Sequence, residues 1–183
     1  MNSRLLILPL IALASVLSAC ATTTSGNYPP LNASIGDVKD WRMSLYRESG
    51  RIDIKMRLAF ATTTRIALET ANEIEQAPVH LSFSGTDCSK NPDVSVRYSI
   101  ASGVFGYKHF KAPLDWQSDV NISIQWDENT QTSISINGEK VSVQPYIPFK
   151  TLHILGGSGV AHVKELEYTK LTESLPSKQG ATQ

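Results

Sequence analysis

The sequence predicts an all-β protein built as a single sandwich or barrel. Short runs rich in β-branched and aromatic residues recur along the chain, and turn-forming residues separate them at a spacing of roughly 8–12 residues. Within many of these runs apolar and polar side chains alternate, which is typical of strands with one face in a core and the other in solvent. No repeat and no shift in composition marks a second domain, so we expect one β unit over residues 35–170.

The N-terminal segment is typical of a secretory signal. In MNSRLLILPLIALASVLSAC a single cation, Arg4, precedes an apolar run over residues 5–17, and small residues follow before Cys20. A helix of this run reaches about 20 Å, which is short of the roughly 30 Å hydrocarbon core of a bilayer. We therefore expect a cleaved signal peptide over residues 1–19 and no membrane-spanning helix.

The motif LSAC resembles the lipobox of bacterial lipoproteins. This resemblance implies that Cys20 is lipidated and becomes the first mature residue, and that Ala21 after it favours the outer membrane. Several acyl chains anchor a protein firmly, because each buried methylene contributes about 0.8 kcal/mol. Residues 20–34 are small, polar and proline-containing, which predicts a flexible tether after the lipid. We expect a lipid-anchored protein of the outer membrane that faces the periplasm or the cell surface.

The strands are expected in order along the unit that follows the tether. They lie at residues 41–47, 51–60, 65–70, 79–84, 94–100, 120–126, 132–137, 140–143, 151–155 and 162–168. Residues 71–76 are the one segment that favours a turn of helix. The polar tail over residues 171–183 is expected to be disordered.

The second half of the chain carries a resemblance to a known fold. In VNISIQWDENTQTSISINGEKVSV three short alternating strands are joined by DENT and by Asn137-Gly138, a strong signal for a two-residue hairpin turn. An apolar strand, a glycine-rich bend and a closing strand follow. This order resembles the last third of concanavalin A-like lectin and glucanase domains, including laminin G-like modules. The resemblance implies a single antiparallel two-sheet β-sandwich of the jelly-roll type.

The stretch RIDIKM, residues 51–56, lacks the carboxylates that a related class of enzyme carries on such a strand. Laminarinase-like glycoside hydrolases carry Glu-x-Asp-x-x-Glu on a strand, whereas here Arg51 and Met56 stand at the outer positions and only Asp53 remains. The unbroken alternation places the charged residues on one face and Ile52, Ile54 and Met56 on the core face. A retaining glycosidase needs two carboxyls about 5–5.5 Å apart, so we predict that the protein is not an enzyme of this type.

Other chemical signals in the chain favour ordinary structural roles. The histidines, which show no metal-binding spacing, are His80, His109, His153 and His162. The acidic residues Asp115, Asp119, Asp127 and Glu128 favour solvated turn carboxylates over a calcium site. Cys88 is expected to be an inert thiol. We expect no metal, no cofactor and no catalytic residues, and the balance of 17 Lys plus Arg against 17 Asp plus Glu gives no electrostatic motive for nucleic-acid binding.

Binding is better supported than chemistry, and the candidate lies in the segment ASGVFGYKHFKAPLDW. Glycines and aromatic residues are interleaved there, and an exposed ring can stack on a sugar while neighbouring polar groups bind its hydroxyls. The candidate ligand-binding residues are Tyr107, Lys108, His109 and Trp116. Core packing is the stronger interpretation for Phe105, Phe110 and Trp116, while Tyr107 is evenly balanced between core and surface.

Three functions are therefore compatible with the sequence. The first is a non-catalytic, membrane-anchored lipoprotein that binds glycan or another cell-envelope component, for which the lack of excess charge favours a neutral or weakly charged ligand. The second is a structural or assembly lipoprotein that binds a protein partner through the charged stripe Arg51, Asp53, Lys55 and Arg57 or through an edge strand. The third is a glycoside-processing enzyme with an unrecognised site.

Overall fold

The computed structural model describes residues 23–25, 31–45, 49–58, 63–70, 76–85, 91–111, 114–127, 131–145 and 149–171. The expected signal peptide, Cys20, Cys88 and the tail beyond residue 171 lie outside the described residues. Of the expected helical turn over residues 71–76, only Gln76 is described.

Apart from the single 3₁₀ position Gln76, the regular structure of the described residues is β-strand, and every strand pairing is antiparallel. The strands are β1 Thr23–Ser25, β2 Leu31–Ser44, β3 Ser49–Leu58, β4 Thr63–Glu69, β5 Val79–Ser84, β6 Asp93–Ala101, β7 Val104–His109, β8 Asp119–Asp127, β9 Thr132–Ile136, β10 Glu139–Val143 and β11 Thr151–Lys170.

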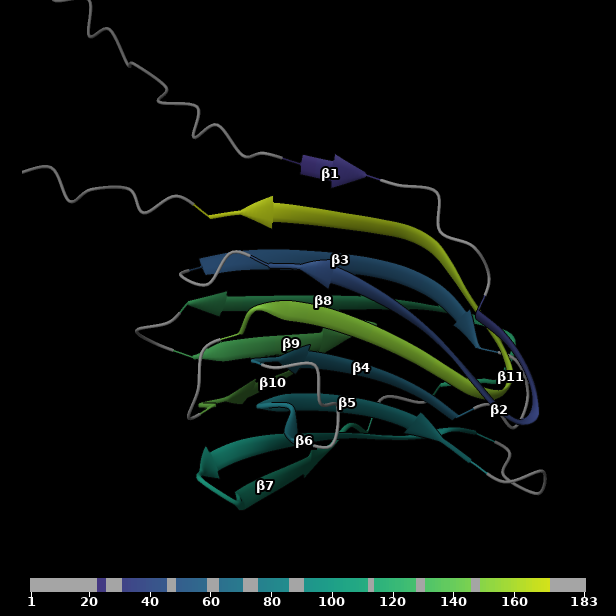
Figure 1. Ribbon diagram of the computed structural model, residues 1–183, viewed down its shortest axis with the longest axis horizontal. Coiled ribbons are helices and arrows are strands. Elements are labelled where there is room, and N and C mark those ends of the chain that lie inside the picture. The colour runs from purple at the N-terminus through teal and green to yellow at the C-terminus, as the bar shows by residue number, and fades with distance from the viewer. Residues whose placement is uncertain are drawn as a thin grey trace, which may run out of the picture.

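The strands form two sheets that share β11. Residues 151–157 of β11 pair with β2 and β4, giving a sheet in the order β2-β11-β4-β5-β6-β7, which we call the β5 sheet. Residues 161–170 of β11 pair with β3, giving a sheet in the order β10-β9-β8-β3-β11, which we call the β3 sheet. In Figure 1, β11 and β2 curve together at one end of the molecule. The predicted two-sheet antiparallel sandwich is confirmed.

The glycine-rich bend joins two parts of one strand, where the sequence predicts two separate strands. The register of β11 against β2 shifts between Gly157 and Gly159, so pairing continues through the bend. Glycine permits such a bend because it has no side chain to clash as the strand changes sheet. The single strand β11 therefore connects the two layers.

Two further differences concern segments that the sequence assigns to irregular structure. β1 pairs with β11, and β2 begins at Leu31, so strand pairing reaches into the expected tether. The segment expected to be a binding loop contains β7, which pairs along β6. Gly106 interrupts the side-chain pattern of β7, and the ring of Tyr98 occupies the space where a side chain at that position would stand.

The core lies between the two sheets and follows the alternation in the sequence. On β3, the residues Ile52, Ile54, Met56 and Leu58 are buried, while the charged stripe faces outward. The register shift near this strand lies in β11, between Val163 and Glu165, so β3 itself stays regular. Trp126, 2% exposed, stacks on Tyr168 and meets Phe149 edge-on, each with ring centroids 6.0 Å apart. This ring cluster closes one end of the core.

The Asn-Gly turn has the geometry that the sequence predicts. Asn137 and Gly138 have φ angles of 47° and 92°, and Ile136 pairs with Glu139 across the two-residue turn. Both turn positions thus occupy the left-handed region that Asn and Gly tolerate best. The β9–β10 hairpin is set by this local chemistry.

Candidate functional site

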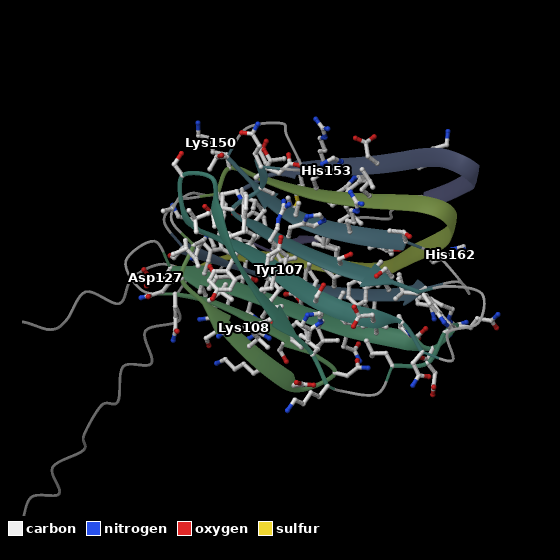
Figure 2. All side chains as sticks on the ribbon, turned by 90° about the horizontal axis from the view of Figure 1, so that it is seen from below. Tyr107, Lys108, Asp127, Lys150, His153 and His162 are labelled. Carbon is white, nitrogen blue, oxygen red and sulfur yellow. The ribbon has the colours of Figure 1, made fainter. Side chains whose placement is uncertain are left out.

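The outward face of the β5 sheet brings aromatic and cationic side chains from three neighbouring strands into one row. The register places His80 of β5 beside Arg97 of β6, and Arg97 beside Tyr107 of β7. Residues two apart on a strand share a face, so Phe105 and His109 flank Tyr107 on the same side. Figure 2 views the molecule from the side on which β7 lies and labels Tyr107.

Arg97 and Tyr107 present two different binding groups side by side. The guanidinium carbon of Arg97 lies 4.6 Å from the centroid of the Phe105 ring, a cation–π contact that orients the cation. Tyr107 is 64% exposed, whereas His80 is buried. An exposed ring beside an oriented guanidinium can stack on an apolar face of a ligand while N–H groups bind its oxygens.

The structure separates the four candidate residues that the sequence singled out. Tyr107 and His109 are exposed on the outward face, and the Nδ1 atom of His109 lies 3.7 Å from Asp93 Oδ1. Lys108 points to the opposite side of β7, where its Nζ donates to the carbonyl oxygen of Ser142, 2.5 Å away. In Figure 2 Lys108 lies beside the green β9–β10 hairpin.

Trp116 lies away from this face, in the turn before β8, where it is partly buried against the core. The neighbouring Gln117 N–H donates to Leu58 O at 2.8 Å, which holds that turn at the end of β3. Phe110 is buried, as the core interpretation of this ring predicts. The four residues therefore do not form one site, and only Tyr107 and His109 share a face.

Sequence reasoning missed Arg97, His80 and Phe105 as members of this surface. A signal for Arg97 was present, because VSVRYSI alternates and places Arg97 on the polar side of its strand. The alignment of Arg97 with Tyr107 depends on the register between β6 and β7. The sequence does not specify this register, because it predicts a loop where β7 lies.

A groove lies between the sheets where the edges of β7 and β10 face each other. Its volume is about 620 Å³, and its lining includes Tyr98, Ile100, Lys108, Gln131 and Ser142. Ile100 is 51% exposed there. The hydrogen bond from Lys108 crosses this groove, so Lys108 acts as a bridge between the two sheets.

His153 forms a buried polar cluster on the other half of the β5 sheet. Its Nδ1 lies 2.7 Å from Glu69 Oε1 and its Nε2 lies 3.1 Å from Asp40 Oδ2. Glu69 is fully buried, His153 is 2% exposed, and Arg42 lies 3.3 Å from the same Asp40 carboxylate. Because His153 is covered, it is not placed to meet a substrate. The cluster instead ties β2, β11 and β4 together.

The charged stripe of β3 is occupied by ion pairs with its own neighbours. Arg51 pairs with Asp53 at 2.7 Å, and Lys55 pairs with Glu165 at 3.1 Å. Asp119 accepts hydrogen bonds from Lys164 and Arg57, which lower the pKa of its carboxyl below the ordinary value. Asp53, Glu165 and Asp119 thus each have a cationic partner on this surface. Glu128, the fourth residue weighed for calcium, lies outside the described residues.

Within the described part of the chain, no group of His, Cys, Asp and Glu side chains is arranged to hold a metal ion. No helix among the same residues has the length and apolar character to cross a membrane.

No family model matches the sequence, and no curated protein sequence matches it. Solved structures do share its fold. A homodimeric agglutinin from chicken liver matches with a TM-score of 0.54 and 11% identity, over 71% of this chain and 99% of its own. A tetrameric galectin from the ball sponge Cinachyrella sp. matches with a TM-score of 0.54 and 14% identity, over 72% of this chain and 100% of its own. The apo Crh5 transglycosylase matches with a TM-score of 0.53 and 13% identity, over 90% of this chain and 82% of its own. The chain therefore has a galectin-like jelly-roll sandwich, a fold that lectins and a transglycosylase share.

Proposed function

We propose that this protein is a lipid-anchored, non-catalytic lipoprotein of the outer membrane that binds glycan through the outward face of β5, β6 and β7. The observation that carries the proposal is the exposed ring of Tyr107 beside the oriented guanidinium of Arg97. A ring of this kind stacks on the C–H side of a sugar, and each stacking contact contributes about 1 kcal/mol. Many anchored copies raise such a weak affinity through multivalency.

The anchoring part of the proposal rests on the lipobox-like LSAC at Cys20. Replacing Cys20 with Ser should abolish labelling with radioactive palmitate and release the protein from membranes or leave its signal uncleaved. Persistent labelling of the Cys20→Ser variant would show that the lipid is attached elsewhere.

The absence of catalysis is supported by the residues of β3. Arg51 and Met56 stand where laminarinase-like enzymes have carboxylates, and the remaining Asp53 is paired with Arg51. Binding a protein partner through the β3 stripe is less favoured, because the stripe residues already pair with one another or with neighbouring strands.

The glycan-binding surface is tested on an array of envelope and other microbial glycans with detergent-solubilised full-length protein. Tyr107→Ala should reduce the signal at least fivefold and leave the thermal midpoint within about 1 °C, since a 64% exposed ring contributes little to the core. Tyr107→Phe keeps the ring and should keep most of the binding.

Ile100→Ala is the matched control, because Ile100 is also half-exposed but lines the groove on the other side of the β6–β7 hairpin. If Ile100→Ala reduces binding and Tyr107→Ala does not, the site is the groove and not the outward face. If the wild-type protein retains no glycan, the proposed function is wrong.

A further inference from the structure

β7 is the last strand of the β5 sheet, and no other described strand pairs with its outer edge. The N–H of Phe110 donates to the carbonyl oxygen of Val94 on β6 at 3.0 Å, and the register between the two strands is unbroken over residues 105–109. In an antiparallel ladder, residues bonded to the neighbouring strand alternate with residues whose N–H and C=O point away from it. Phe105, Tyr107 and His109 therefore turn both backbone groups toward the open edge.

The groove beside this edge offers apolar contacts. It has a volume of about 620 Å³, and its lining includes Ile100, Val143 and Pro145. Ile100 is 51% exposed, and Val104 at the start of β7 is 52% exposed. A sheet edge that binds a peptide uses backbone hydrogen bonds for affinity and contacts with alternate side chains for specificity. The edge of β7 and the groove supply both kinds of contact.

Lys108 gives the groove a local positive charge. Among the described residues that line the groove, it is the only charged one. Its Nζ donates to the carbonyl oxygen of Ser142 at 2.5 Å. An ammonium group has three N–H donors, so two remain for a ligand. A carboxylate that enters the groove would therefore accept a charge-assisted hydrogen bond from Lys108, and no lining carboxylate would repel it.

A second copy of this chain matches the groove less well than a different protein. If the β7 strands of two copies paired edge to edge, the second copy would direct the side chains that share the face of Lys108 toward the groove. Residues two apart on a strand share a face, so these side chains are Val104, Gly106 and Lys108. None of the three is acidic, and one repeats the charge that the groove already carries.

We propose that the open edge of β7 binds an extended segment of another protein as an added strand, and that an acidic side chain of this segment binds Lys108 in the groove. The backbones of Phe105, Tyr107 and His109 form the strand pairing. The proposed glycan site uses the outward side chains of the β5 sheet, whereas strand addition uses the edge and the inner side of β7. Binding of the protein segment therefore does not depend on binding of glycan.

The test uses ten-residue peptides selected from a randomised phage-displayed library on the full-length protein in detergent. We expect the selected peptides to alternate polar and apolar residues and to share one Asp or Glu. Backbone N-methylation of a synthetic peptide, one residue at a time, should weaken binding at least tenfold at alternate positions. The positions between them should change binding by no more than threefold, because only every second N–H of an added strand faces β7.

Paired changes assign the acidic side chain to Lys108. Replacing that side chain of the peptide with its amide, or Lys108→Gln in the protein, should each weaken binding about tenfold, because a charge-assisted bond is lost. Both changes together should weaken binding no more than either alone, since they remove the same bond. Lys140→Gln, an exposed cation on β10 outside the groove lining, is the matched control and should have no more than a twofold effect.

Tyr107→Ala separates this inference from the proposed glycan binding. The variant keeps the backbone N–H and C=O of residue 107, so it should change peptide binding by no more than threefold while it reduces binding of glycan. A loss of both kinds of binding in a variant that keeps its thermal midpoint would overturn the separation of the two surfaces.

The remaining outcomes decide the partner and the pairing. A library without a peptide that binds more tightly than about 1 mM, or N-methylation effects that do not alternate, would overturn strand addition. Independent effects of the peptide change and Lys108→Gln would overturn the charge pair, and so would an equal effect of Lys140→Gln. A wild-type dimer in analytical ultracentrifugation that the peptide dissociates would assign the edge to a second copy instead. If Lys108→Gln lowers the thermal midpoint, the N-methylated peptides still test strand addition on the wild-type protein.

Discussion

Gly50 of β3 is predicted to be a position where even one methyl group destabilises the fold. Gly50 pairs with Trp126 of β8, and a Cβ atom at residue 50 would lie 2.7 Å from Cη2 of that ring and closer still to Cζ2. Trp126 has little freedom to move away, because it is 2% exposed, stacks on Tyr168 and meets Phe149 edge-on. The methyl group must therefore displace either the ring cluster or the backbone of β3.

Overpacking a core of this kind costs about 1–3 kcal/mol, and the fixed ring places Gly50→Ala near the upper end, at roughly 2–3 kcal/mol. For a domain of this size each kcal/mol lowers the thermal midpoint by about 2–4 °C, so we expect a fall of roughly 4–12 °C. Gly106→Ala is the matched control. A Cβ atom at residue 106 would lie 2.5 Å from Cζ and 2.7 Å from the hydroxyl of Tyr98, but Tyr98 is only partly buried and its ring can turn toward the groove. We expect this change to cost less than about 1 kcal/mol.

Urea unfolding followed by far-UV circular dichroism measures both variants without relying on the fluorescence of the displaced Trp126. The comparison of the two glycines removes the general effect of replacing Gly with Ala in a strand. The reasoning fails if Gly50→Ala changes the free energy of unfolding by less than about 0.5 kcal/mol, or if Gly106→Ala costs as much.

Three further expectations follow from the faces of the sheets. Ile54→Ala should cost about 2–5 kcal/mol in urea unfolding as a core cavity, and Asp53→Asn on the opposite face no more than about 0.5 kcal/mol, so similar losses would mean that the face assignment is wrong. Glu69→Gln removes a buried carboxylate from the histidine cluster and should cost about 1–3 kcal/mol, whereas an unchanged urea midpoint would show that the carboxylate is not needed there. Asp119 has a pKa below its ordinary value of 3.8, so its contribution to stability is present above that pH and is lost as the pH falls through the lowered pKa. The stability difference between wild type and Asp119→Asn should therefore be constant near neutral pH and shrink below about pH 4, and a difference that grows on acidification would contradict the assigned pairs.

Local chemistry in the sequence determined the class of fold and much of its detail. The alternation of β3 predicted which side chains enter the core, because successive residues of a strand must face opposite sides. Asn137-Gly138 predicted its turn, because both residues tolerate positive φ angles. Glycine makes the local pattern misleading in two places: the sequence predicts a loop where β7 pairs with β6, and two separate strands where β11 is continuous.

The candidate site was decided by tertiary structure. The row of His80, Arg97 and Tyr107 exists only because β5, β6 and β7 pair in one register, and a shift of one residue would turn Tyr107 to the other face of its strand. The His153 cluster joins residues that are 84 and 113 positions away along the chain. Neither arrangement has a local signature, because the pairing of distant strands is set by how two whole sheets pack against a common core, and no short stretch of sequence contains that information.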